Sequence, residues 1–307
     1  MSLLGHGKLV TVLQYFTDRI DDYWHILYPL TGPAEREADP YLYFYDISRK
    51  ATDFKGPFSD EGVYLFKGYD GKWHIHALEI SQYALACWLA WRKADDATWR
   101  QRALVHCDWL VKHQQERGEW CIGHKNPRYA DLPDRWSSAL AQALAISALL
   151  RAWRYSDEVR YLQAAERAAA FLEYPVEGGG LKRMLVDGNF IYEEYPRLQT
   201  SGVLNGYISA VLALRELAEA LPERWEVAYT RNIANLLRIL PQYDTGYWSL
   251  YALDGTLSSG FYHRYVTTQL EALGEFEPAF LQYAKRFEAY THNLRYILRA
   301  LRKKVLR

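Results

Sequence analysis

Three short segments of the sequence concentrate side chains that can accept or donate protons. They are residues 193–195 (Glu-Glu-Tyr), 243–251 (Tyr-Asp at its start, Tyr at its end) and 262–265 (Tyr-His-Arg-Tyr). Positioned carboxylates and phenols serve as general bases and acids. Burial in apolar surroundings makes a carboxylate a stronger base, and a phenol with an ordinary pKa of ~10 still carries its proton at neutral pH and can donate it. The pattern therefore indicates acid–base chemistry.

Motifs for other chemistries are missing from the sequence. It contains no G-x-S-x-G, no H-E-x-x-H and no dinucleotide fingerprint, and the glycine run 178–180 lacks the Lys-Ser/Thr of a phosphate loop. His74 and His76 have H-x-H spacing, but at the start of a helical segment the two side chains would point in different directions. Packing or capping is thus favoured over metal ligation. We expect no metal and no nucleotide cofactor.

Length and composition indicate a folded protein with a sizeable core. Half of the 307 residues are apolar, 24% are charged, and the 37 Lys and Arg balance the 37 Asp and Glu, which disfavours nucleic acid as a partner. No apolar run approaches the ~20 residues of a membrane span, and the N-terminus lacks a signal peptide's uninterrupted apolar stretch. The three cysteines cannot all pair. We therefore expect a cytoplasmic protein.

Four pairs of helical segments position the proton-transfer groups. The first members are rich in Ala, Leu and Ser on several faces, which is typical of buried helices, and the second members carry charges along one side. A repeat of about 60 residues with this layering predicts an all-α fold, an incomplete α/α toroid of about four helical hairpins. The pairs are 73–93 with 96–117, 134–154 with 157–173, 203–220 with 223–240, and 264–274 with 277–302.

Loop lengths locate the expected site. Connections within each pair are short, whereas those from one pair to the next are long and rich in Gly and aromatic residues. In a toroid the long connections emerge at one rim, so a functional site is expected at that rim and the axial mouth beneath it. Alternating runs such as 247–253 predict small β-hairpins there. The 25 Tyr and 11 Trp suit both a helical core and a groove that stacks sugars.

The two ends of the chain carry separate expectations. We expect one domain over residues 1–307, in which 1–70, with a short helix near 8–21, wraps around the helical repeats of 71–307. The C-terminus 295–307 is basic and amphipathic. It is interpreted as a solvated helix, with docking on acidic lipid or polymer as the alternative.

Four ordered motifs resemble the C-terminal catalytic region of D-glucuronyl C5-epimerases. Similarities at 108–111, with Gln114 and Gly118, and at 136–142, and a weaker one at 80–83, extend the resemblance to about residues 70–275. The four motifs are Tyr-Glu-Glu-Tyr-Pro at 192–196, Val-Leu-Asn-Gly at 203–206, Leu-Pro-Gln-Tyr-Asp-Thr-Gly at 240–246, and Tyr262-His263 with Thr-Gln-Leu at 268–270.

The resemblance implies an isomerase that inverts C5 of D-glucuronate residues in a polysaccharide, giving L-iduronate without a metal or nucleotide. An acidic polysaccharide or oligosaccharide is then the substrate. The C5 proton is α to a carboxylate, so its removal builds a second negative charge that the site must stabilise. One group takes the proton from one face of the sugar and another returns a proton to the other face. The oligomeric state stays open, a homodimer included.

The resemblance also implies roles for individual residues. The family's catalytic positions fall on Glu194, Tyr195, Tyr251 and Tyr262, and its Asn in L-N-G falls on Asn205. We expect Glu194 and Tyr262 to take the opposed proton-transfer roles. Tyr195 and Tyr251 would hydrogen-bond the enediolate or exchange roles with that pair, and Asn205 would orient the sugar or Glu194. Rim packing, or for Asn205 a hydrogen bond at a helix start, is the alternative.

One departure from the family concerns the cation that would bind the uronate carboxylate. The family places an Arg three residues after the position of Tyr251, where this chain has Asp254. Trp136 and Tyr243, which lie within the similar motifs, complete the expected substrate-binding residues. Candidates for the substitute cation are Arg128, Arg183, Arg264, Lys125, Lys182 and Arg197.

Three other functions compete with epimerisation. A uronate lyase would form the same C5 carbanion and then eliminate the substituent at O4. A glycoside hydrolase would need a carboxylate pair, recruited from Glu193, Glu194, Asp244 and Asp254. A catalytically silent carbohydrate-binding toroid would need only an aromatic rim.

Overall fold

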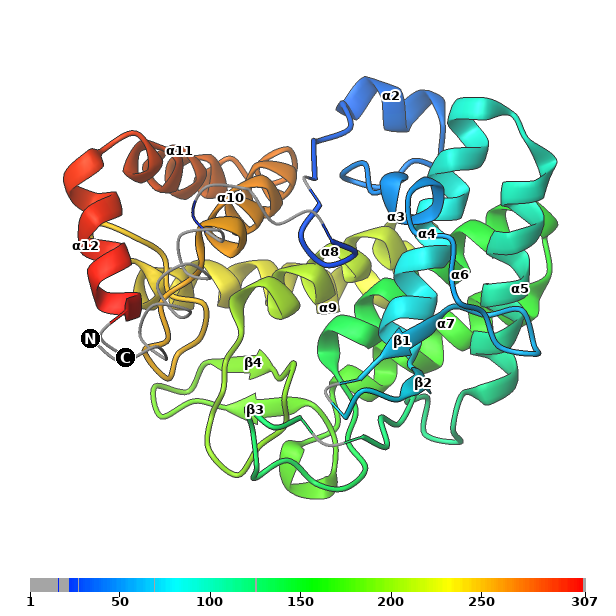
Figure 1. Cartoon of the computed structure of the whole chain (residues 1–307), viewed down its shortest axis with the longest axis horizontal. Coiled ribbons are helices and arrows are strands. Elements are labelled where there is room, and N and C mark those ends of the chain that lie inside the picture. Colours follow the sequence, from blue (N-terminus) through cyan, green and yellow to red (C-terminus); the bar gives the residue numbers. More distant parts are fainter. Residues whose placement is uncertain (1–15, 17–21, 27, 69, 125, 306–307) are drawn as a thin grey trace.

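The computed structural model describes residues 16, 22–26, 28–68, 70–124 and 126–305, and it forms a ring of helical hairpins (Figure 1). The expected all-α, incomplete α/α toroid is confirmed. None of the helices in the described ranges combines the length and apolarity that a membrane span requires. The inner helices are α4 (Ala77–Ala94), α6 (Ala139–Ser156), α8 (Leu204–Ala220) and α10 (Gly260–Gly274), and their outer partners are α5 (Ala97–His113), α7 (Val159–Leu172), α9 (Pro222–Ile239) and α11 (Ala279–Thr291).

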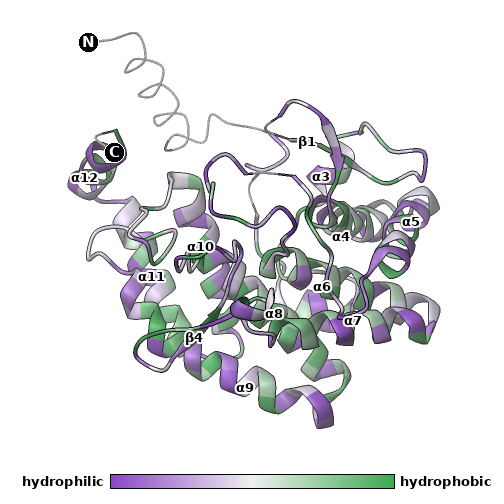
Figure 2. Cartoon of the chain, turned by 90° about the horizontal axis from the view of Figure 1, so that it is seen from below, coloured by the Kyte–Doolittle hydropathy of each residue, from purple (hydrophilic) through white to green (hydrophobic). Residues whose placement is uncertain are grey.

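Sequence composition separates the inner from the outer helices. All residues of α6 from Ala139 to Ala152 are buried, as a helix covered on every side requires. The outer helix α9 buries only one face, and Figure 2 shows hydrophilic and hydrophobic residues alternating along it. Two hairpins turn within a few residues because Asp95 and Asp157 adopt left-handed backbone conformations, with φ of 50° and 56°.

Several boundaries differ from those predicted by periodicity. Residues 73–75 form a strand, and α6 starts only after Ser138. Helix α10 begins at Gly260, four residues before the predicted start, because Ser259 Oγ accepts a hydrogen bond from the Tyr262 backbone N–H at 3.2 Å. The predicted segment 277–302 breaks at Asn293, and the last helix, α12 (Leu294–Val305), is separate.

Two small antiparallel β-hairpins lie at the rim. In the first, Phe66 pairs with His74, and in the second, Arg183 pairs with Ile191. The alternating segment 247–253 makes only isolated bridges, such as Leu250 with Leu257. The strands are β1 (Leu65–Lys67) with β2 (Trp73–Ile75) and β3 (Lys182–Met184) with β4 (Phe190–Tyr192), and short 3₁₀ turns cover Val176–Gly178 and Leu240–Tyr243.

The segment from residue 22 to 52 fills the open side of the ring between α10 and α4, where Figure 1 places α2 (Pro33–Ala38) and α3 (Arg49–Thr52). Tyr45 hydrogen-bonds Tyr265 of α10 through their hydroxyls at 2.9 Å. On the other side, Tyr23 donates its hydroxyl to the Glu79 carbonyl of α4 at 3.2 Å. The helix expected near 8–21 lies almost entirely outside the described residues.

Arg151, a fully buried residue of α6, ties this segment to the inner helices. Its guanidinium donates to the backbone carbonyls of Tyr41 and Leu42 at 2.9 and 2.6 Å. It also forms an ion pair with Glu216 of α8 at 2.8 Å, with side chains only 1% and 5% exposed. A buried ion pair is costly to break because one charge is left without compensation.

We predict that Arg151→Met lowers the free energy of unfolding by about 3 kcal/mol or more, because Glu216 loses its partner and two carbonyls lose their donor. Denaturant unfolding followed by circular dichroism measures the change. Arg160→Met, on the exposed side of α7, removes surface ion pairs to Asp108 and Glu158 and should cost less than ~1 kcal/mol. Equal losses in the two variants would contradict this role of Arg151.

Candidate active site

A cavity of about 640 Å³ opens where the inner helices begin. Its walls include one residue from the first turn or N-cap of each inner helix, namely His76, Ser138, Asn205 and Tyr262. A helix N-terminus carries a partial positive charge and favours anions. Four such ends around one cavity make it suited to a negatively charged ligand.

Glu194 lies in this cavity two residues after the end of strand β4, and its side chain is almost completely buried. Burial raises the pKa of its carboxyl group to about 7, although hydrogen bonds from Tyr195, Asn205 and Tyr251 and the charge of Arg128 oppose the rise. The bond from the Asn205 amide measures 3.3 Å. A carboxyl group with this pKa can accept and release a proton near neutral pH.

The start of α8 is shaped to receive the Glu194 side chain. A methyl group at Gly206 would lie 2.8 Å from Glu194 Oε2, closer than real Cβ contacts, and 3.1 Å from Glu194 Cβ, tighter than most of them. The glycine in the L-N-G motif is therefore needed for close approach. The preceding Asn205 lines the cavity and is 2% exposed, and its buried side-chain oxygen has no hydrogen-bond partner among the described residues.

Aromatic rings form the wall around the carboxyl group. The rings of Tyr251 and Tyr262 meet edge to face with centroids 5.0 Å apart, and Tyr195 packs on Trp136 at 5.6 Å. Burial, followed by the negative charge of Glu194, raises the pKa of Tyr195 and Tyr251 well above the ordinary value. Both phenols therefore stay protonated and can donate hydrogen bonds to an anion.

Arg128 brings a positive charge to the cavity from the long loop between α5 and α6. Its guanidinium carbon lies 5.6 Å from the centre of the Tyr251 ring. Asp254 does not line the cavity and lies 3.9 Å from Arg197. Among the cation candidates with described positions, Arg128 alone lines this cavity.

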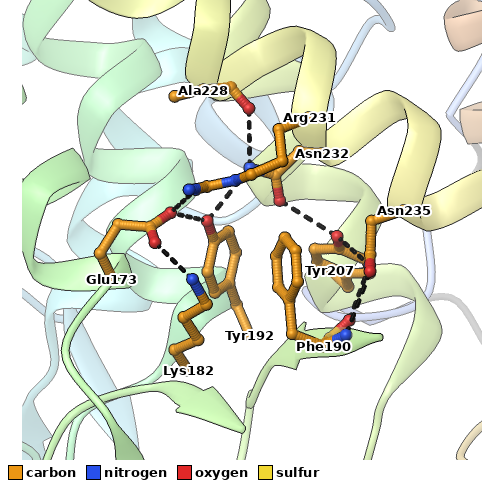
Figure 3. Close-up of polar contacts among 9 residues, drawn as sticks. All are labelled: Glu173, Lys182, Phe190, Tyr192, Tyr207, Ala228, Arg231, Asn232 and Asn235. Atoms are coloured by element: carbon orange, nitrogen blue, oxygen red, sulfur yellow. Dashed lines mark hydrogen bonds and ion pairs between the residues drawn. The ribbon is translucent and has the colours of Figure 1, made fainter. Parts of the chain in front are cut away.

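A buried polar network fixes strand β4, which delivers Glu194 (Figure 3). Tyr192 donates its hydroxyl to Glu173 of α7 and accepts a bond from the Asn232 amide of α9 at 3.1 Å. Asn235 of α9 bonds both backbone groups of Phe190, at 3.1 and 2.7 Å, as a neighbouring strand would. The strand is thus held by two outer helices.

Glu193, which is fully buried, points away from the cavity and ties the end of β4 to the loop before α8. Its carboxylate accepts hydrogen bonds from the backbone N–H groups of Ser201 and Gly202 at 3.0 and 2.8 Å. Arg183 of β3 donates to it at 2.8 Å. This residue therefore couples the position of Glu194 to that of Asn205.

The structure does not bring every expected substrate-binding residue to the cavity. Arg183 is occupied by Glu193, and Tyr243 is fully buried and donates its hydroxyl to the Gly202 carbonyl at 2.8 Å. Arg264, on α10 two residues after Tyr262, points elsewhere because successive helical residues face different directions. These three residues lie outside the cavity lining, and their role in substrate binding stays a prediction. Glu194, Tyr195, Asn205, Tyr251, Tyr262, Arg128 and Trp136 do line the cavity.

One wall of the cavity was missed by sequence analysis. It consists of Glu79 and Gln82 on α4 with His76 and His124, joined by the aromatic rings of residues 24 and 66. His76 caps α4, since its Nδ1 accepts from the Leu78 N–H at 3.2 Å, as expected of a capping histidine. In the described residues no three His, Cys, Asp or Glu side chains are placed to hold a metal ion. Glu79 and Gln82 have the spacing of residues on the buried face of a helix, so the sequence pattern did not indicate that they line a cavity.

Fold and site together define an α/α toroid with a cavity equipped for acid–base chemistry on an anion. Residues 113–289, more than half of the chain, match the family described as D-glucuronyl C5-epimerase C-terminus. The chain belongs to this family.

Individual relatives agree with that assignment. The chain is 33% identical to the D-glucuronyl C5-epimerase of Caenorhabditis elegans over 162 residues, which cover 48% of this chain and 26% of that protein. It is 31% identical over 141 residues to an uncharacterized protein of Methanocaldococcus jannaschii, covering 43% of this chain and 44% of that one. The matches thus span less than half the length of either relative.

A solved structure supports the fold alone. A GH76 α-mannanase from Bacteroides thetaiotaomicron is similar over 93% of this chain and 72% of its own, with a TM-score of 0.50 and 10% sequence identity. The two proteins share a helical toroid.

We predict that Glu194 destabilises the fold as pH rises. Because the folded-state pKa of this acid is raised to about 7, its favourable contribution is complete below the unfolded-state pKa and is lost as pH rises through about 7. Between about pH 4 and pH 8, Glu194→Gln should gain about 3 kcal/mol of unfolding free energy relative to the unmodified protein. Urea unfolding across this range measures the gain.

The exposed Glu116→Gln variant serves as the matched control and should show no such gain. A difference between Glu194→Gln and the unmodified protein that stays constant with pH would contradict the prediction.

Proposed function

We propose that this protein inverts C5 of D-glucuronate residues in a polysaccharide, giving L-iduronate, with its own side chains moving the protons. The observation that carries the proposal is the buried carboxyl of Glu194, whose pKa is raised to about 7, hydrogen-bonded to Tyr195 and Tyr251 in the cavity that Tyr262 also lines. Membership in the family supports the same reaction.

The uronate carboxylate would bind at the positively charged part of the cavity. Arg128 and the N-termini of the inner helices favour binding of the uronate carboxylate. This carboxylate is bonded to C5 and accepts the electron pair when the C5 proton is removed. Desolvation in the cavity strengthens these interactions, because a low local dielectric screens charge less than water does. The carboxylate is thereby held while its charge increases.

Proton transfer would then take place on two faces of the sugar ring. Glu194 takes the C5 proton and becomes neutral, and the electron pair left at C5 spreads into the carboxylate as an enediolate. Tyr195, Tyr251 and Arg128 stabilise the added negative charge by hydrogen bonds and electrostatic attraction. Tyr262 gives its proton to the opposite face of C5, which completes the inversion. Exchange with solvent reprotonates Tyr262 and deprotonates Glu194.

A glycoside hydrolase is less well supported. Of the four carboxylates that this hypothesis would recruit, Glu193, Asp244 and Asp254 do not line the cavity. Glu193 is bonded to Arg183, and Asp244 accepts hydrogen bonds from Arg286 and Tyr290 at 3.1 and 2.8 Å. These contacts leave Glu194 without the partner that the sequence suggested.

Incubation with glucuronate-containing polysaccharides in heavy water tests the function. Epimerisation washes deuterium into C5 while the chains stay intact. Unsaturated chain ends would instead establish a lyase, and new reducing ends a hydrolase. Binding of the polysaccharide without isotope exchange would indicate a non-catalytic toroid and overturn the proposal.

We predict that Glu194→Gln and Tyr262→Phe each lower the rate of C5 isotope exchange at least ~100-fold, the low end for losing a general acid or base. Tyr155→Phe, at the far end of α6, is the matched control and should retain normal exchange. Circular dichroism checks that the fold is intact. Near-normal exchange in both active-site variants would remove this assignment.

We also predict that Arg128→Gln lowers kcat/KM for exchange about 10- to 100-fold, because the developing charge loses a cation. Arg135→Gln changes an exposed arginine of the same loop that does not line the cavity, and it should have little effect. Equal kinetics for the two variants would mean that another residue binds the carboxylate.

A further inference from the structure

Helix α12 carries a concentrated positive charge in a protein whose total charge is balanced. The helix contains five cationic side chains and no anionic one. It lies at the edge of the molecule beyond α11, and Figure 2 shows hydrophilic residues over much of its surface. The cationic residues are Arg295, Arg299, Arg302, Lys303 and Lys304.

These charges are not spread evenly around the helix. At 100° per residue, Arg295, Arg299, Arg302 and Lys303 fall on one flank, and all four are exposed. Arg299 also places its guanidinium 3.9 Å from the centre of the Tyr247 ring. The result is a cationic strip about 12 Å long, since eight residue steps of about 1.5 Å separate Arg295 from Lys303.

The opposite side of α12 is turned toward the protein. Ala300 is fully buried, Tyr296 packs against Tyr290 of α11 at 5.5 Å, and Ile297 contacts the core. Only Leu294 and Leu298 expose large apolar surfaces beside the strip. A helix that inserts into lipid needs a free apolar face, whereas Ala300, Tyr296 and Ile297 of α12 are turned to the protein. A hydrated anionic ligand therefore fits the strip better than a membrane does.

The helix also reaches the candidate active site. Lys304, in its last turn, lines the same cavity as Glu194 and Tyr262. At about 100° per residue, Lys304 lies about 100° or more around the helix from each residue of the strip, so an acidic polymer with one unit in the cavity reaches the strip by passing around the last turn of α12. We propose that the strip formed by Arg295, Arg299, Arg302 and Lys303 binds the acidic polysaccharide chain outside the cavity.

This inference rests on the proposed function only for the identity of the ligand as a uronate polymer. The strip lies on α12, outside residues 113–289, which match the family. Exposed charges bind weakly one at a time and are screened by salt. A row of exposed charges attracts a long anionic polymer at several points, but it does not contact a short ligand that fits inside the cavity.

The test compares long polyglucuronate with its trisaccharide, using the variant Arg295→Gln/Arg302→Gln/Lys303→Gln. Glutamine keeps the helix propensity while removing three charges. We expect affinity for the polymer, measured by calorimetry at low salt, to fall about tenfold or more and to lose much of its salt dependence. Affinity for the trisaccharide should change less than twofold.

The matched control is Lys55→Gln/Lys112→Gln/Arg135→Gln, which removes three exposed charges that do not line the cavity. It should bind both ligands normally. Equal polymer affinity in the two triple variants, or no polymer binding by the unmodified protein, would overturn the inference. Binding to vesicles of phosphatidylcholine and phosphatidylserine in equal parts, lost in the α12 variant while polymer binding persists, would assign the strip to lipid instead.

The two proposals fail in different ways. If isotope exchange is absent but the α12 variant still loses polymer affinity, the epimerase proposal falls and the binding strip stands. If exchange on the trisaccharide is normal and polymer affinity is unchanged, the strip alone is rejected.

Discussion

The candidate site depends on one constraint: the carboxyl group of Glu194 is buried, yet it can still lose its proton near neutral pH. Burial alone would favour the protonated form, whereas the hydrogen bonds from Tyr195, Asn205 and Tyr251 favour the charged form. The two effects leave a pKa of about 7, so both forms are accessible under ordinary conditions. The surrounding fold supplies both effects, because the aromatic rim excludes water and the start of α8 provides the amide.

Such a balance requires that Glu194 cannot move away to solvent. Strand β4 is held on one side by the outer helices, through Tyr192 and Asn235, and on the other by the Glu193 carboxylate. Neither set of contacts touches the cavity. The outer layer of the toroid therefore contributes to the site by fixing the backbone that delivers its central residue, while the inner layer contributes the helix N-termini and Tyr262.

The helical pairs were predicted well because the two kinds of helix differ in composition. The inner helices are buried on all faces and are mostly apolar, whereas the outer helices are buried on one face and carry charges on the other. The prediction placed the start of α10 too late, since the cap at Ser259 is a local hydrogen bond that periodicity does not register. Glu194 and Tyr262 were predicted from motifs, and both line the same cavity. The sequence does not indicate the direction of the Arg183 side chain, which in strand β3 donates to Glu193 and does not line the cavity. The α4 wall was missed because Glu79 has the spacing of a core residue.

The positive charge near Tyr251 is supplied by a residue from another loop. An enediolate needs a nearby positive charge, but that charge need not come from a fixed chain position. Here the position three residues after Tyr251 is occupied by Asp254, which lies 3.9 Å from Arg197, and Arg128 reaches the Tyr251 ring from a different loop. If Arg128 holds the carboxylate, recognition of the acidic sugar depends on the loop between α5 and α6, so changes in that loop would alter substrate choice while the proton-transfer groups stay in place.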